Sequence, residues 1–392
     1  MRLPDPSEPF LLLDDARPVG AARARLYRDP VEIIVARTQG EVQRALDRVG
    51  EARERGLHAA GWLAYEAGFA LEERLCPLGG ASGMPLLWFG LFDGFRFVEP
   101  DDVPALVEGY GPAAAGPVRP LVDRTAYGLA FAEVQERIRA GDIYQANLTF
   151  PCELPVSGDP RALYAAIRPR AGAGYGGIVH TGEDWLLSFS PELFFTLVRG
   201  RLTARPMKGT APRLDDAAAD AAAAKHLRED AKQRAENLMI VDLLRNDLSR
   251  VSRAGSVTVP ELFHVDSYPT VHQMISTIRA ELLPGLSAVD VLRTIFPCGS
   301  VTGAPKMQAQ EVIAAVEPFA RGPYTGAIGR IDADGNAAFN VAIRTICVEK
   351  GARVGRLGLG SGIVADSSEE DEWRECLAKA RFIGAVSAEP AE

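Results

Sequence analysis

The chain has 392 residues, of which 47% are hydrophobic and 24% charged, and its 43 basic and 52 acidic residues leave a net charge of -9 at pH 7. This composition is ordinary for one large or two smaller globular domains, and it lacks the basic surface by which proteins bind nucleic acid. The five cysteines are scattered without a C-x-x-C pair, which argues against a disulfide framework or a thiolate metal site. No run approaches the roughly 18 apolar residues of a membrane span. We therefore expect a cytoplasmic chain without a membrane or nucleic-acid partner.

The first 118 residues are expected to form an N-terminal region of mixed strands and helices. Thr38 and Glu41 form a capping box at the start of a helix that Gly56 ends. Strands are expected at residues 31–36, 61–66 and 86–97. Residues 111–117 have the proline and glycine content of a linker, which divides the chain into an N-terminal region, 1–118, and a catalytic region, 119–388, and we expect the two regions to form one intertwined structural unit.

The remainder of the chain also combines helices with paired strands. Helices are expected at about residues 123–141, 226–249 and 369–386, and strands at 143–150, 186–198 and 202–207. Residues 215–224 are mostly alanine and aspartate, and we expect an exposed connection or helix start without a chemical role. Because strand pairs and helices are grouped rather than alternating, the pattern predicts an α+β fold.

Two glycine-rich segments are candidates for ligand binding. Residues 296–306 precede an amphipathic helix, whose first backbone amides can bind an anion. They do not match a nucleotide-binding loop, because Ala304 and Pro305 separate the glycine from Lys306, and a structural turn is an equally good interpretation. Residues 358–364 carry glycine at every second position, so one face of the expected strand would leave its backbone open to a ligand.

Charged residues on two expected helices are candidate metal ligands. Glu372, Glu375 and Lys379 lie at i, i+3 and i+7 on one helix face, and Glu236 precedes an apolar run of another helix. Such spacing usually marks a solvated face with salt bridges. Two glutamates from different helices would also suit Mg²⁺, which commonly takes only one or two protein carboxylates. The pattern leaves both interpretations open.

Three further residues have a structural alternative beside a functional one. His272 has no metal-ligand spacing to another histidine, and a histidine bonded within the core is the default. Arg344 lies at the end of an apolar strand, where its guanidinium needs either a structural or a bound carboxylate. Cys298 lacks the strand-turn-helix setting of a nucleophile, so glutaminase activity in this chain is not expected.

Six motifs in unbroken order resemble those of the chorismate-utilising enzymes, which include anthranilate, aminodeoxychorismate, isochorismate and salicylate synthases. The resemblance covers about residues 120–385 and implies a large α/β sandwich of two packed, mainly antiparallel sheets with outer helices. The motifs are Ser190-Pro191-Glu192, Pro206-Met207-Lys208-Gly209-Thr210, Asp242-Leu243-Leu244-Arg245-Asn246-Asp247-Leu248, residues 299–306, Arg321-Gly322-Pro323-Tyr324-Thr325-Gly326 and Gly360-Ser361-Gly362-Ile363-Val364.

The resemblance also implies a role for each matching residue. The Mg²⁺ ligands would be Glu236 and Glu375, with Glu372 assisting through water. Substrate-binding positions are Tyr324 and Arg344 at the enolpyruvyl carboxylate, and Ser300, Gly360, Ser361, Gly362 and Lys379 around the ring carboxylate and the metal. The catalytic positions are Lys208, Glu192 as general acid towards the 4-hydroxyl, and His272 beside the ring.

Two positions distinguish among the members of this family. Isochorismate and salicylate synthases carry a water-activating lysine where this chain has Gln145, which disfavours water as the nucleophile. Lys208 stands where anthranilate synthases usually have alanine and aminodeoxychorismate synthases have lysine. The resemblance therefore implies amination of chorismate at C4, with Lys208 adding at C2 while Glu192 protonates the departing 4-hydroxyl. Anthranilate synthesis is the alternative, and a nucleotide-binding or structural module is a third hypothesis.

A second subunit is expected to supply the ammonia. We find no amidotransferase domain in this chain, so a separate glutamine amidotransferase would deliver ammonia to chorismate, towards 4-aminobenzoate and folate. Residues 10–17 occupy the place of the effector motif of feedback-sensitive anthranilate synthases without matching it, and tryptophan feedback is not expected.

Overall fold

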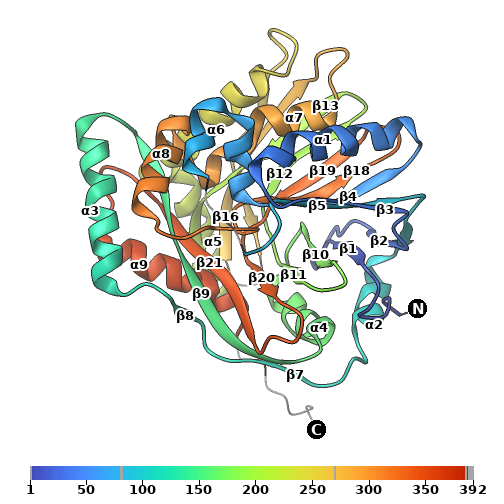
Figure 1. The fold of residues 1–392 in the computed structure, drawn as a ribbon. Coiled ribbons are helices and arrows are strands. Elements are labelled where there is room, and N and C mark those ends of the chain that lie inside the picture. The colour runs from blue at the N-terminus through green and yellow to red at the C-terminus, as the bar shows by residue number, and fades with distance from the viewer. Residues whose placement is uncertain (1, 80–82, 269–270, 385, 387–392) are drawn as a thin grey trace.

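The strands of the chain form two antiparallel sheets that pack face to face, with helices on their outer sides (Figure 1). The computed structural model describes residues 2–79, 83–268, 271–384 and 386. Pro269 and Thr270, shortly before His272, and residues 385, 387 and 388 of the predicted catalytic region and last helix lie outside the described residues. The predicted α+β class with two packed antiparallel sheets is confirmed.

The first sheet, sheet A, contains eleven strands among the described residues. Their spatial order is β17 (Gly303–Ala304), β9 (Gln145–Gly158), β21 (Val354–Ile363), β20 (Thr345–Val348), β11 (Trp185–Ser188), β10 (Gly176–His180), β1 (Phe10–Asp14), β2 (Ala24–Arg28) and β6 (Arg96–Val98), with β7 (Ala113–Ala115) and β8 (Arg119–Pro120) paired to β9.

The second sheet, sheet B, contains ten strands in the same part of the chain. Their order is β14 (Met207–Pro212), β16 (Val271–Glu281), β13 (Arg201–Arg205), β12 (Leu193–Val198), β19 (Ala337–Val341), β18 (Ala327–Ile331), β4 (His58–Leu63), β5 (Leu87–Phe92) and β3 (Glu32–Ala36), with β15 (Thr258–Ser267) paired to β16.

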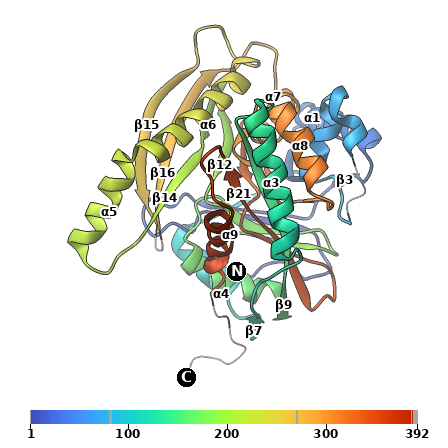
Figure 2. The same cartoon turned by 90° about the vertical axis from the view of Figure 1, so that its left-hand side faces the viewer.

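Helices cover the outer face of each sheet (Figures 1 and 2). Those on sheet B include α1 (Gln39–Glu54), α6 (Ala231–Ser249) and α7 (Ala288–Ile295), and those on sheet A include α3 (Arg124–Ala140), α4 (Pro160–Ala171), α8 (Lys306–Val316) and α9 (Glu369–Ala378). The remaining helices are α2 (Val103–Val107), α5 (Ala217–Glu229) and the 3-10 turns η1 (Tyr65–Leu71), η2 (Glu73–Leu78), η3 (Pro100–Asp102), η4 (Gly299–Val301) and η5 (Lys379–Phe382). In the described part of the chain, no helix has the length and apolar character needed to cross a membrane.

The interior between the sheets is filled by aromatic side chains of the inward-facing strand positions. Trp62 of β4 stacks on Trp88 of β5 with ring centroids 5.4 Å apart, and Tyr27 of β2 lies 5.3 Å from Phe92. Each of these rings removes a large apolar area from water, which stabilises the sandwich.

Residues 1–118 supply strands to both sheets rather than forming a separate body. In sheet A, Leu12 of β1 pairs with Ile178 of β10, and in sheet B, Trp62 of β4 pairs with Ile328 of β18. The predicted linker at 111–117 is therefore not a free connection, since its three alanines form β7 on the edge of β9. Backbone pairing needs no large side chain, so a run of alanines can join the edge of a sheet.

The predicted long helix at 226–249 is two helices. Asp230 has an extended backbone, and its carboxylate accepts a hydrogen bond from the backbone N–H of Gln233, which starts α6 directly after α5. The alanine-rich residues 215–224 form most of α5, which Asp216 caps through Ala219.

Candidate active site

A row of glycines on one face of β21 makes room for side chains from other segments. Gly358, Gly360 and Gly362 lie on the same face because side chains alternate along a strand. A Cβ on Gly358 would lie 2.0 Å from the Tyr324 ring, and a Cβ on Gly362 would lie 2.8 Å from Lys208 Nζ. The predicted bare strand face is present, and two predicted site residues approach it.

Lys208 lies on β14 and is paired with a glutamate from α6. Its Nζ is 3.4 Å from Oε2 of Glu236, and both side chains are largely buried. Asn237 donates a hydrogen bond to the backbone carbonyl of Lys208 at 3.2 Å. Gly209 follows with φ of +102°, a left-handed conformation that glycine adopts without strain. This turn interrupts the register of β14 on β16 and directs the amine towards Gly362.

Glu192 is a buried carboxyl next to this amine. It is 3% exposed, and its Oε1 has no hydrogen-bond partner among the described residues. Burial raises the pKa of Glu192 to about 7, against opposing effects from the Ser300 hydroxyl, the backbone N–H of Met207 and the charges of Lys208 and Lys379. A carboxyl that is about half protonated at neutral pH is suited to general acid catalysis.

The backbone around Glu192 is held firmly by its neighbours. The hydroxyl of Ser190 donates to the carbonyl of Val341 at 2.6 Å, and the Val341 N–H donates to the carbonyl of Glu192 at 3.1 Å. These bonds tie the Ser-Pro-Glu segment between β11 and β12 to β19, so the side chain of Glu192 extends from a fixed backbone.

Lys379 and Glu375 complete the charged cluster from the last helix. Lys379 Nζ donates to the carbonyl of Gly360 at 2.8 Å and lies 2.8 Å from Oε1 of Glu375. Lys379, and to a lesser extent Lys208, lower the pKa of Glu375, whose side chain is 53% exposed. Glu375 and Glu236 are therefore both within electrostatic range of Lys208, which joins α6 and α9 in one site.

Glu372 and Ser361, two other predicted site residues, are less available to a ligand. Glu372 accepts a hydrogen bond from the hydroxyl of Ser367 at 2.6 Å. Ser361 is fully buried, and strand alternation turns its side chain to the face opposite the glycine row. Only the backbone of Ser361 can therefore contribute to the site.

Arg344 is a partly buried cation without an acidic partner among the described residues. It lies between β19 and β20 with φ of +50°, and its carbonyl accepts a hydrogen bond from the N–H of Phe189. Burial lowers the pKa of the Arg344 guanidinium, because no nearby carboxylate compensates for the lost water. Leaving a guanidinium unpaired is costly, so this position suits a ligand carboxylate.

The hydrogen bonds of His272 go to residues outside the predicted site. Its Nδ1 lies 2.8 Å from the hydroxyl of Ser267, and its Nε2 lies 2.8 Å from Oδ1 of Asp220 on α5. Both ring nitrogens are therefore occupied by protein groups. Asp220 belongs to the alanine-rich segment that was expected to lack a chemical role, and it instead connects His272 with Arg213.

Gln145, which the sequence singled out only because it is not a lysine, itself lies in the site. Its side chain is 1% exposed, and its amide nitrogen and oxygen have no hydrogen-bond partner within the described residues. A Cβ on Gly362 would lie 2.6 Å from its Nε2, so the amide is next to Lys208. A buried amide that lacks both partners is costly unless a ligand or water satisfies it.

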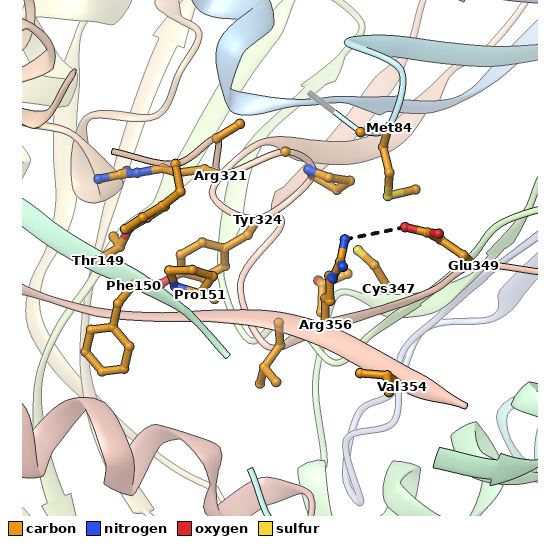
Figure 3. Close-up of a pocket in the computed structure, with 18 of the residues that line it drawn as sticks. Met84, Thr149, Phe150, Pro151, Arg321, Tyr324, Cys347, Glu349, Val354 and Arg356 are labelled. Atoms are coloured by element: carbon orange, nitrogen blue, oxygen red, sulfur yellow. Dashed lines mark ion pairs between the residues drawn. The ribbon is translucent and has the colours of Figure 1, made fainter. Parts of the chain in front are cut away.

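A cavity of about 210 Å³ lies on sheet A beside Tyr324 (Figure 3). Its walls include Phe319, Pro323, Tyr324 and Val354, and the Arg356 guanidinium lies 3.5 Å from Glu349 near them. Tyr324 borders this mainly apolar space at the Gly358 end of the glycine row, whereas Lys208 lies against Gly362 at the other end.

Comparison with known proteins agrees with this arrangement. The family described as chorismate binding enzyme matches residues 10–385 of the chain. The chain belongs to the chorismate binding enzyme family. The resemblance inferred from the six motifs is confirmed, and the match extends into the N-terminal region, which those motifs do not cover.

Similar curated proteins include aminodeoxychorismate synthases and anthranilate synthases. "Aminodeoxychorismate synthase component 1" of Salmonella typhimurium is 42% identical over 260 residues, which are 66% of this chain and 57% of that protein. The protein of that name from Escherichia coli is 43% identical over the same shares. "Anthranilate synthase component 1" of Thermus thermophilus is 40% identical over 70% of this chain and 59% of that protein. The chain spans less than two thirds of these relatives.

Solved structures of other chorismate binding enzymes share the fold. Anthranilate synthase component I from Streptococcus pneumoniae has a TM-score of 0.79 and 26% identity, covering 93% of this chain and 92% of that chain. The menaquinone-specific isochorismate synthase of Escherichia coli has a TM-score of 0.72 and 20% identity, covering 96% and 87% of the two chains, which supports the fold alone.

The carboxylates near Lys208 are enough in number for a Mg²⁺ site, but each is paired with a lysine. Among the described residues, no group of three or more histidine, cysteine, aspartate or glutamate side chains is close enough to hold a metal ion. Glu236 and Glu375 each pair with a lysine instead. Because Mg²⁺ usually keeps several waters and takes one or two protein carboxylates, these two glutamates are sufficient in number.

Proposed function

We propose that this chorismate binding enzyme aminates chorismate at C4 to give 4-amino-4-deoxychorismate, as a step towards 4-aminobenzoate and folate. The observation that carries the proposal is the Lys208 amine at the glycine row, next to a buried Glu192 whose pKa is raised to about 7. The relatives of 42% and 43% identity named aminodeoxychorismate synthase component 1 support the same reaction.

In the proposed mechanism, Lys208 forms a covalent bond to the substrate and later leaves it. The neutral amine adds at C2, both conjugated ring double bonds shift, and the 4-hydroxyl departs as water with a proton from Glu192. Ammonia then forms a bond to C4, the two double bonds shift back, the bond between C2 and Lys208 breaks to release the neutral amine, and the new ammonium group at C4 returns a proton to Glu192. Splitting one difficult substitution into two steps is the general advantage of a covalent nucleophile.

Charged and backbone groups around the site would orient the two carboxylates of chorismate. Arg344 and the Tyr324 hydroxyl would bind the enolpyruvyl carboxylate, which supplies the anion that the guanidinium lacks in the described residues. Lys379, Ser300 and the backbone of residues 360–362 would face the ring carboxylate. With both nitrogens already bonded, His272 would brace β15, β16 and α5 rather than contact the substrate.

Glu236 and Glu375 would hold Mg²⁺, with Glu372 assisting through water. The ion would supply positive charge beside the ring carboxylate. Its binding would compete with the lysine partners that these glutamates have in the structure.

Ammonia rather than water is the proposed nucleophile, and a second subunit its proposed source. Gln145 cannot act as the base that water would need, and its two unpartnered amide atoms are available to a small polar molecule. Relatives named component 1 support a second component, which we propose to be a glutamine amidotransferase.

The purified chain incubated with chorismate, Mg²⁺ and an ammonium salt tests the proposal, with NMR identifying the carbon that carries nitrogen. Nitrogen at C4 is expected. Nitrogen at C2 with loss of pyruvate would instead establish anthranilate synthesis, the alternative supported by the Thermus thermophilus relative of 40% identity. ATP binding without chorismate turnover would support the nucleotide-binding hypothesis.

A pair of lysine variants tests the covalent role. Lys208→Ala should abolish C4 amination, whereas Lys225→Ala, which removes a 73% exposed side chain on α5, should not. A Lys208→Ala protein that still aminates C4 at near-normal rate would exclude the covalent role and leave the family assignment unchanged.

A further inference from the structure

The loop that carries Tyr324 is bound by a glutamate from the N-terminal region. The backbone N–H of Arg321 donates to Oε1 of Glu66 at 2.6 Å, and the backbone N–H of Gly322 donates to Oε2 at 3.0 Å. The backbone N–H of Tyr65 donates in return to the carbonyl of Gly322 at 2.8 Å. Three hydrogen bonds therefore connect η1 with two consecutive residues of the loop.

The two carboxylate oxygens of Glu66 match this pair of backbone N–H donors. It is 4% exposed, and burial raises the pKa of its carboxyl against the effect of the backbone hydrogen bonds that it accepts. Two parallel N–H donors need two acceptor oxygens, which a carboxylate has and an amide lacks. A buried carboxylate is costly unless it is bonded in this way.

The Arg321 side chain does not compete for Glu66. Its guanidinium is 1% exposed and donates to both oxygens of Glu317 and to the carbonyls of Val301 and Asn147. This network fixes the beginning of the loop from the side of sheet A, while Glu66 fixes the backbone from the N-terminal region.

The position of the Tyr324 ring depends on this backbone because one side of the ring borders a cavity. One neighbour is the bare backbone of Gly358, and another is the cavity beside Phe319 (Figure 3). The next residue, Thr325, has φ of +61° and is held by a hydrogen bond from its N–H to the carbonyl of Ala342. A strained conformation persists only where surrounding bonds impose it.

We propose that Glu66 is a positioning residue that sets the place of the Tyr324 hydroxyl for the substrate. The inference rests on the proposed function only in taking the enolpyruvyl carboxylate as the ligand of Tyr324. It assigns to the N-terminal region an indirect part in substrate binding, through Tyr324, although that region supplies none of the groups that we propose to contact chorismate.

Chorismate affinity measured by calorimetry, without ammonia, tests the proposal even if the chain aminates nothing. In Glu66→Gln the amide nitrogen faces a backbone N–H, and we expect binding to weaken about ten-fold or more. Glu66→Asp keeps both oxygens on a shorter side chain and should recover part of the affinity. Glu73→Gln changes an exposed glutamate of η2 and should bind like the parent.

A double-mutant cycle distinguishes positioning from a general loss of structure. In a Tyr324→Phe background, Glu66→Gln should weaken chorismate binding by less than three-fold, because the hydroxyl that it positions is already absent. Equal losses in both backgrounds would overturn the proposal. So would unchanged affinity in Glu66→Gln.

Hydrogen exchange supplies a readout that does not depend on chorismate. The amides of Arg321 and Gly322 should exchange at least ten-fold faster in Glu66→Gln than in the parent or in Glu73→Gln, because each loses its acceptor or faces a competing donor. Unchanged exchange at these two amides would overturn the proposal. If exchange rises as expected while the parent binds chorismate without aminating it, the proposed function fails and the positioning role stands.

Discussion

Gly362→Ala should separate folding of this enzyme from its activity. The added methyl carbon would lie 2.8 Å from Lys208 Nζ and 2.6 Å from Gln145 Nε2, whereas ordinary contacts begin at 3.4 Å. Both neighbours are ends of flexible side chains, so they can withdraw without moving the backbone. We therefore expect the free energy of unfolding to fall by about 1 kcal/mol, the lower end of the range for overpacking.

The cost should appear in catalysis. To restore an ordinary contact the amine must retreat by at least about 0.6 Å, and a misplacement near 1 Å reduces reaction rates by about 100-fold. We expect kcat for C4 amination to fall between about ten-fold and 100-fold. A coupled assay of amination gives kcat and KM, and denaturant unfolding gives stability.

A glycine in open surroundings provides the matched control. Gly40 lies in α1 with no atom within 4 Å of an added Cβ. Gly40→Ala should therefore leave kcat unchanged and raise the free energy of unfolding by about 0.5 kcal/mol. If Gly362→Ala keeps kcat within about three-fold of the parent, the placement of the amine against the glycine row would be refuted as a determinant of catalysis.

Three further predictions concern Glu192, Arg344 and the proposed metal ligands. Because the pKa of Glu192 is raised from 4.5 to about 7, its contribution to stability is complete below about pH 4.5 and is lost as the pH rises through about 7. Between pH 4.5 and pH 8 the free energy of unfolding of the parent, measured with urea, should thus fall by about 3 kcal/mol relative to that of Glu192→Gln. Amination by the parent should also decline above pH 7. Identical pH profiles of stability in the two proteins would contradict this prediction. Arg344→Gln removes a partly buried cation without an acidic partner in the described residues, so KM for chorismate should rise about ten-fold or more while thermal stability holds or increases. A lower stability would mean that the guanidinium has a structural partner. Chelation of Mg²⁺ should stop amination, and Glu236→Gln or Glu375→Gln should each raise the Mg²⁺ concentration for half-maximal rate by about ten-fold; an unchanged requirement in both variants would exclude them as ligands.

Short-range patterns of the chain predicted several elements correctly. The predicted Thr38 and Glu41 capping box begins α1. Bonds of equally short range begin α3 at Asp123, end it at Gly141 in a left-handed conformation, and begin α9 at Ser368. Each of these signals acts between residues a few positions apart, so the same bonds form wherever the segment packs.

Predictions that depended on partners from distant segments were less complete. The sequence offered no means of knowing which protein groups would meet the nitrogens of His272, because Asp220 and Ser267 reach it from another helix and another strand. Glu66 was missed altogether, although a glutamate within a run of apolar residues signals a buried polar contact. Residues 111–117 became a paired edge because β9 extends far enough to accept them.

Local sequence was enough to establish the types of most elements, the glycine row and, through motif order, the family. The meeting of Lys208, Glu192 and Glu375 depends on the packing of two sheets and two helices, since no pattern along the chain encodes the distance between them. Burial decided the chemistry of the site as well. A carboxyl such as Glu192 changes its pKa only when the surrounding fold removes water from it, and that desolvation exists only in the assembled structure.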